Sequence, residues 1–226
     1  MAHRGDVTAY RMADDAEIDV YHVKPVAARR GGLVLIQEIF GLTDHIREQC
    51  DVYAAEGYEV LAPALYDREA PGLQAPYSPE GIAMAIKIAR EQHPFDLSIS
   101  DTQACIDALK PAGPVFITGY CYGGSVTYAA AARCDGLSAA SGYYGSMIPR
   151  LAAEPPRCPT ILHFGRRDSG IPLDAIAAFE AARPEVTVHL YDAGHGFNSD
   201  RRADYDATSA ALAFQRTLAL FRAHGG

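Results

Sequence analysis

One cysteine in this sequence has neighbours that suit a nucleophile. Gly119 and Gly123 flank Cys121, which lies between an apolar run at 115–117 and an alanine-rich run at 126–132 that predicts a helix. This Gly-x-nucleophile-x-Gly spacing is typical of a strand–turn–helix elbow, because the strained turn leaves no room for a Cβ two residues before or after the nucleophile. The helix N-terminus favours a thiolate and later an oxyanion. The alternative is a buried cysteine in a glycine-rich turn.

Two further polar residues follow predicted strands. Asp168 comes after an apolar strand at 160–165, and His195 comes after a strand at 186–191. In an open α/β sheet the carboxyl ends of the strands meet at one edge, where ligands bind. Cys121, Asp168 and His195 occur in the order nucleophile, acid, histidine, which is the order of α/β-hydrolases. We therefore expect a Cys-His-Asp triad. Taken alone, Cys121 could be a buried core thiol, Asp168 a loop acid and His195 a turn histidine.

The elements that must carry these residues alternate between strand and helix patterns. Residues 7–12 and 18–23 predict an antiparallel hairpin at a sheet edge, and the apolar run at 33–36 predicts a central strand covered on both faces. Further strands are expected at 58–62, 115–117, 137–143, 160–165 and 186–191, and helices at 44–56, 79–91, 97–109, 173–182 and 205–224. This alternation predicts an α/β fold with a mostly parallel sheet and helices on both faces. Without repeats or a composition break, residues 1–226 are expected to form one domain.

The composition argues against several classes of partner, location and metal site. A net charge of −8 argues against nucleic acid or an anionic membrane as the main partner. The start of the chain lacks the apolar core of a signal peptide, and no apolar run approaches the roughly 20 residues of a membrane span, so a cytoplasmic location is expected. The five cysteines form no CxxC pair, which fits reduced thiols better than a disulfide framework or a zinc site. We expect no metal and no cofactor, and a monomer or small homo-oligomer.

Over nearly its whole length, the chain resembles the dienelactone hydrolase (carboxymethylenebutenolidase) family of the α/β-hydrolase fold. The most specific matching segments are Gln-Glu-Ile-Phe-Gly at 37–41, Leu65-Tyr66 with Arg68 and residues 70–72, Gly-Tyr-Cys-Tyr-Gly-Gly at 119–124, Gly-Tyr-Tyr-Gly at 142–145, and Ala-Gly-His at 193–195 with Phe197. A cysteine in the elbow together with a glutamate after the early strand distinguishes this family within the fold.

The resemblance implies a role for each residue of the site. Cys121 would attack an ester or lactone carbonyl, His195 would hold the thiolate and later activate water, and Asp168 would orient the imidazole. The backbone N–H groups of Ile39 and Tyr122 would form the oxyanion hole.

The resemblance also implies a guard for the resting thiol. Glu38 would approach Cys121 and move aside when substrate enters, because a neighbouring carboxylate disfavours a thiolate that is otherwise open to oxidation. The alternative for Glu38 is a solvated loop charge. Phe40, Tyr144 and Phe197 are expected to supply an apolar wall for the substrate.

The substrate is less well specified. The best-known family members carry an arginine shortly after the catalytic histidine that binds a substrate carboxylate, whereas here Arg201 and Arg202 come only later. Arg68, Arg166 and Arg167 are the remaining candidates, although Arg68 could instead pair with an acid and the other two could face solvent. We therefore expect weak activity on a free-carboxylate lactone and better activity on a neutral or larger ester or lactone. The alternatives are a general carboxylesterase or thioesterase and a non-catalytic ligand-binding protein on the same fold.

Overall fold

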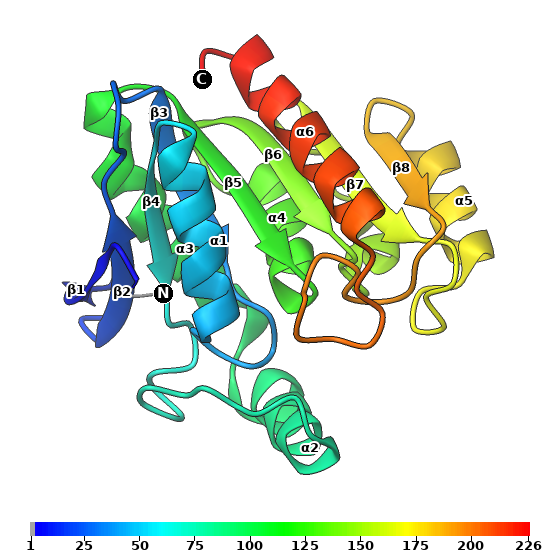
Figure 1. Ribbon diagram of the computed structural model, residues 1–226, viewed down its shortest axis with the longest axis horizontal. Coiled ribbons are helices and arrows are strands. Elements are labelled where there is room, and N and C mark those ends of the chain that lie inside the picture. The colour runs from blue at the N-terminus through cyan, green and yellow to red at the C-terminus, as the bar shows by residue number, and fades with distance from the viewer. Residues whose placement is uncertain (1–2) are drawn as a thin grey trace.

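In the computed structural model, which describes residues 3–226, eight strands form one sheet in the order β1-β2-β4-β3-β5-β6-β7-β8 (Figure 1). The strands are β1 Asp6–Arg11, β2 Glu17–Val23, β3 Gly31–Ile36, β4 Tyr58–Pro63, β5 Val115–Tyr120, β6 Leu137–Tyr143, β7 Thr160–Gly165 and β8 Thr187–Tyr191. From β4 to β8 neighbouring strands are parallel, whereas β1 and β2 form an antiparallel hairpin at one edge. The predicted α/β-hydrolase fold and its edge hairpin are confirmed.

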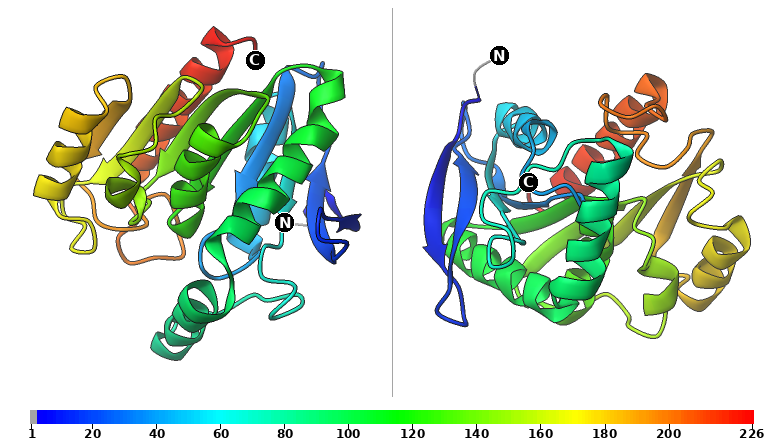
Figure 2. Two further views of the ribbon diagram at one scale, coloured as in Figure 1. Left: turned by 180° about the vertical axis from the view of Figure 1, so that it is seen from behind. Right: turned by 90° about the horizontal axis from the view of Figure 1, so that it is seen from below.

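Helices cover both faces of this sheet. They are α1 Asp44–Ala55, α2 Pro79–Lys87, α3 Phe95–Leu109, α4 Tyr122–Arg133, α5 Leu173–Ala182 and α6 Ala207–Ala223. Helices α1 and α6 lie on one face, and α3, α4 and α5 lie on the other (Figure 2, right). The helix predicted at 79–91 is α2 followed by one π-helical turn at Ile88–Gln92, after which Pro94 forces an extended residue before α3.

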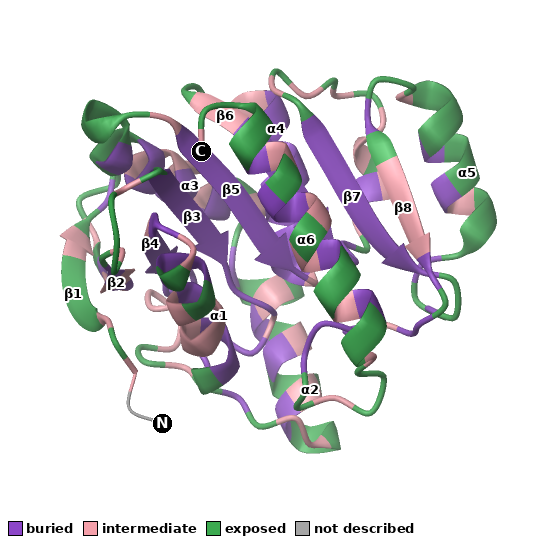
Figure 3. Cartoon of the chain, turned by 45° about the horizontal axis from the view of Figure 1, so that its top comes forward, coloured by how far each residue is buried: buried purple, intermediate pink, exposed green. Residues whose placement is uncertain are grey.

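Burial explains the apolar runs of the central strands. Every residue of β3, β5 and β7 is buried, whereas β1 is almost wholly exposed (Figure 3). Strands covered by helices on both faces need apolar side chains on both, which is why these sequences do not alternate. Within residues 3–226, no helix combines the length and apolar character needed to span a bilayer.

Helix α2 lies apart from the two helical layers, beyond the carboxyl ends of β3 and β4 (Figure 1). A small apolar cluster of Phe40, Ala75 and Ala85 attaches it to the loop after β3, with Ile39 and Tyr77 packed against the cluster. The loop that carries the predicted oxyanion donor Ile39 is therefore braced by α2 and by the segment before it.

Candidate active site

The backbone at Cys121 has the geometry of an elbow. Cys121 has a positive φ of 56° between the end of β5 and the start of α4, and its N–H donates to the Tyr143 carbonyl at 3.0 Å. A Cβ added at Gly119 would lie 2.4 Å from the Gly123 oxygen, and one at Gly123 would lie 2.4 Å from the Ile36 oxygen. No side chain fits at either position, so the flanking glycines are a steric requirement of the turn.

The three residues that the sequence analysis grouped do lie together. His195 Nδ1 is 2.7 Å from Asp168 Oδ2, and His195 Nε2 is 3.2 Å from Cys121 Sγ. The Asp168 side chain is buried, and its other oxygen accepts the Gly170 N–H at 2.8 Å, which fixes the carboxylate. The imidazole thus bridges a fixed carboxylate and a partly exposed thiol.

The environment of His195 favours its charged form. Burial lowers the pKa of the imidazole, but the negative charges at Cys121 and Asp168, with their hydrogen bonds, outweigh burial and raise the pKa to about 10. An imidazolium at neutral pH is the partner that a thiolate nucleophile needs.

The proposed oxyanion donors come from two segments that lie against each other. Tyr122 is the first residue of α4, where helical N–H groups have no partner within the helix. Ile39 follows the end of β3. The start of α4 lies directly against this segment, since a Cβ at Gly123 would meet the carbonyl oxygens of both Ile36 and Gln37.

Glu38 is not a solvated loop charge, because its side chain is wholly buried. Its Oε2 accepts a hydrogen bond from the Tyr77 hydroxyl at 3.0 Å, and its Oε1 lies 3.6 Å from an Arg202 nitrogen. Burial, and then the charge of Glu38, raise the pKa of the Tyr77 phenol, so Tyr77 remains a donor.

Arg202 is the residue that sequence reasoning missed. The loop after His195 turns at Gly196, which has a φ of +80°, and folds back so that Arg202 lies against this turn and over the Phe40 ring at 5.8 Å. Arg202 had been set aside in the sequence analysis in favour of Arg68, Arg166 and Arg167. The spacing from His195 gave no signal, because the contact depends on the path of the loop.

Of the other arginine candidates, Arg68 and Arg167 each pair with acids. All three guanidinium nitrogens of Arg68 donate to Asp101 or Asp14, at 2.7–2.9 Å. Asp101 is completely buried and requires this counter-charge, which matches the alternative that Arg68 pairs with an acid. Arg167 pairs with Asp192 on the surface, and Arg166 is exposed.

The three rings expected to form the substrate wall are all buried. Tyr144 and Phe197 pack together at 5.3 Å, and the Tyr144 ring meets the His195 ring edge-on at 5.2 Å. Phe40 packs at 4.4 Å against Tyr77. None of the three presents an exposed apolar surface, so they support the polar residues of the site.

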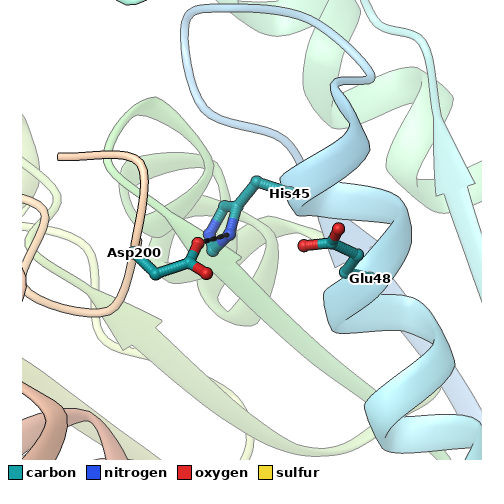
Figure 4. Close-up of side chains that lie close together, drawn as sticks. All are labelled: His45, Glu48 and Asp200. Atoms are coloured by element: carbon teal, nitrogen blue, oxygen red, sulfur yellow. Dashed lines mark ion pairs between the residues drawn. The ribbon is translucent and has the colours of Figure 1, made fainter. Parts of the chain in front are cut away.

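Among the described residues, His45, Glu48 and Asp200 have the spacing of metal ligands (Figure 4). The adjacent guanidinium of Arg201 bonds to both carboxylates, at 2.7 Å to Glu48. The His45 ring lies 3.8 Å from Asp200, and burial lowers its pKa. Because an arginine already neutralises both acids, we assign this cluster a structural role. It connects α1 to the loop that carries Arg202.

Comparison with known proteins identifies the family of the chain. The family model described as dienelactone hydrolase family matches residues 18–225. A Synechocystis protein provisionally named carboxymethylenebutenolidase is 35% identical, over 91% of this chain and 92% of its own length. The Pseudomonas putida carboxymethylenebutenolidase is 31% identical, over 86% of each chain.

A solved structure gives the same result. The crystal structure of a Klebsiella pneumoniae protein provisionally named dienelactone hydrolase superposes with a TM-score of 0.85 at 27% identity, covering 96% of this chain and 98% of that one. The chain therefore belongs to the dienelactone hydrolase family, a family of carboxylic ester hydrolases.

Proposed function

We propose that this protein hydrolyses an ester or lactone through Cys121, with His195 and Asp168 completing a catalytic triad. The observation that carries the proposal is the imidazole of His195 placed 3.2 Å from the Cys121 sulfur and 2.7 Å from Asp168. No cofactor enters this chemistry, and we further expect a single domain acting in the cytoplasm.

The reaction follows from these positions. The Cys121 thiolate adds to the carbonyl carbon, and the N–H groups of Ile39 and Tyr122 stabilise the oxyanion. The intermediate collapses to a thioester while His195 gives its proton to the leaving alkoxide. Neutral His195 then takes a proton from water, the hydroxide adds to the thioester, and the acid leaves as the thiolate re-forms.

The pairing of Glu38 with Arg202 supports a substrate that carries a negative charge. A carboxylate on the substrate can compete with Glu38 for the Arg202 guanidinium, since the 3.6 Å separation of that pair is longer than a hydrogen bond. We therefore infer that an acidic lactone or ester is accepted, in place of the neutral substrate expected from the sequence.

Burst kinetics with a chromogenic ester test the proposal. If thioester hydrolysis is slower than thioester formation, the wild-type enzyme should release one equivalent of alcohol in a burst before the steady-state phase. Cys121→Ala should lose both the burst and the steady-state phase. Cys158→Ala is the matched control, because Cys158 is also partly exposed but lies outside the site. A Cys121→Ala enzyme with unchanged turnover would exclude the proposal.

A further inference from the structure

A buried chain of hydrogen bonds outside the triad ends on the side chain of Tyr122. The Tyr122 hydroxyl lies 2.8 Å from Ser98 Oγ, which lies 2.9 Å from His93 Nε2. On its other side, His93 Nδ1 lies 3.0 Å from Glu69 Oε2. One direction satisfies every group: the phenol donates to Ser98, Ser98 donates to His93, and the His93 Nδ1–H donates to Glu69.

This chain has the composition of a Ser-His-Glu triad, but it is not a second hydrolytic centre. Ser98 has no exposed surface and lies within α3, and its hydroxyl is engaged by both Tyr122 and His93. His93 is also buried. No substrate carbonyl can reach the Ser98 oxygen, so any effect of the chain on the reaction must pass through Tyr122.

Tyr122 is held at both ends. At its far end the ring packs against Tyr66 at 5.6 Å and Phe95 at 5.9 Å, and its hydroxyl is bound by Ser98. At its near end the backbone is the first turn of α4, which is pressed against the end of β3 through Gly123. A side chain fixed in this way also fixes the direction of its own backbone N–H.

We propose that Ser98, His93 and Glu69 are positioning residues that aim the Tyr122 N–H at the reacting oxygen. The inference rests on the proposed function, in which this N–H is an oxyanion donor. Such a donor acts mainly in the transition state, and a small misplacement of catalytic geometry lowers the rate steeply. Loosening the Tyr122 ring should therefore lower kcat and leave KM nearly unchanged.

The test compares Tyr122→Phe and Ser98→Ala with a matched control in the same helix. Each variant should have kcat reduced roughly tenfold, with KM within about twofold of wild type. An aldehyde analogue of the acyl group, which adds to the thiol to form a tetrahedral adduct, should bind more weakly by the same factor. Tyr128→Phe is the control, because Tyr128 is another buried tyrosine of α4 whose hydroxyl donates to the Glu154 carbonyl at 2.8 Å. Its kcat should stay at the wild-type value.

Two further variants keep the test decisive if Tyr122→Phe does not fold. Glu69 is partly exposed, so Glu69→Gln and Glu69→Ala should both fold. Glu69→Gln retains an acceptor for His93 and should keep wild-type kcat, whereas Glu69→Ala should lower it. Where both single variants fold, the double variant Tyr122→Phe/Ser98→Ala should be no slower than the slower single variant, since both substitutions break the same hydrogen-bond chain.

The outcomes separate this inference from the proposed function. If Cys121→Ala is inactive while Ser98→Ala, Tyr122→Phe and Glu69→Ala all retain wild-type kcat, the positioning role is wrong and the proposed function stands. Equal losses of kcat in Tyr128→Phe and Tyr122→Phe would also overturn the positioning role. If Cys121→Ala remains fully active, the proposed function itself fails.

Discussion

The carboxylate of Glu38 and the guanidinium of Arg202 lie 3.6 Å apart, although one follows β3 and the other lies in the loop after His195. The carboxylate is fully buried and its only hydrogen bond among the described residues is the one from Tyr77. A buried carboxylate requires a counter-charge, and Arg202 supplies it. An arriving substrate carboxylate would therefore find Arg202 already paired with Glu38, at a distance longer than a hydrogen bond.

Replacing Arg202 should change which substrates the enzyme prefers. In Arg202→Gln, kcat/KM for a carboxylate-bearing lactone should fall roughly ten- to a hundredfold relative to its methyl ester, because a charge-assisted hydrogen bond is worth about 1.5–3 kcal/mol. The ratio of the two kcat/KM values is the measurement. Arg201→Gln is the control, since the neighbouring Arg201 pairs with Glu48 and Asp200. An unchanged ratio in Arg202→Gln would show that the anion is bound elsewhere.

Removing the charge of Glu38 should expose the resting thiol. A nearby carboxylate disfavours a thiolate, so Glu38→Gln should increase the rate at which iodoacetamide alkylates Cys121 in the absence of substrate. The rate is measured by mass spectrometry of the Cys121 peptide. Glu48→Gln, which removes an equally charged but partly exposed acid of α1, should leave the rate unchanged. A slower reaction in Glu38→Gln, or an unchanged rate with unaltered turnover, would contradict the gating role.

The raised pKa of His195 has a consequence for stability. An unfolded histidine titrates near 6.5, whereas His195 in the folded protein titrates at about 10. The protonated form is therefore favoured by folding, and this contribution is complete below about pH 6.5 and is lost as the pH rises toward 10. The free energy of unfolding of the wild type should fall across this window more steeply than that of His195→Gln. Parallel curves in chemical denaturation would refute the raised pKa.

The elbow leaves no space for a side chain at Gly123. A methyl group there would lie 2.4 Å and 2.5 Å from the oxygens of Ile36 and Gln37, so Gly123→Ala should destabilise the protein by about 1–3 kcal/mol or more and abolish activity. Gly72→Ala is the comparison: Gly72 also has a positive φ, but its added Cβ meets nothing within 4 Å. Thermal unfolding should show the larger loss for Gly123→Ala; similar losses would mean that crowding at the elbow is relieved elsewhere.

Elements that are set by local signals were predictable from the sequence. Strand β6 and helix α5 begin and end at the predicted residues, because apolar periodicity and turn residues are local signals. The grouping of Cys121, Asp168 and His195 was also predictable, since parallel strands deliver their carboxyl ends to one edge.

The long-range polar contacts were not predictable in the same way. The partner of Arg68 was not predictable, because Asp101 is buried on helix α3 and no sequence spacing relates the two residues. Arg202 was missed because its position depends on the whole path of a loop. Such contacts are decided by tertiary packing, and no spacing in the sequence encodes them.

The central claim, that Cys121 is the nucleophile, is tested most directly by partial alkylation at neutral pH followed by peptide mapping and assay of the same samples. Burial raises the pKa of the Cys134 and Cys158 thiols to about 11. Burial also raises the pKa of the Cys50 and Cys105 thiols, so these remain protonated. Iodoacetamide should therefore react first with Cys121. Residual activity should fall in direct proportion to the modified fraction of Cys121 and reach zero when Cys121 is completely modified. Full activity in protein whose Cys121 is completely modified would contradict the claim that Cys121 is the nucleophile.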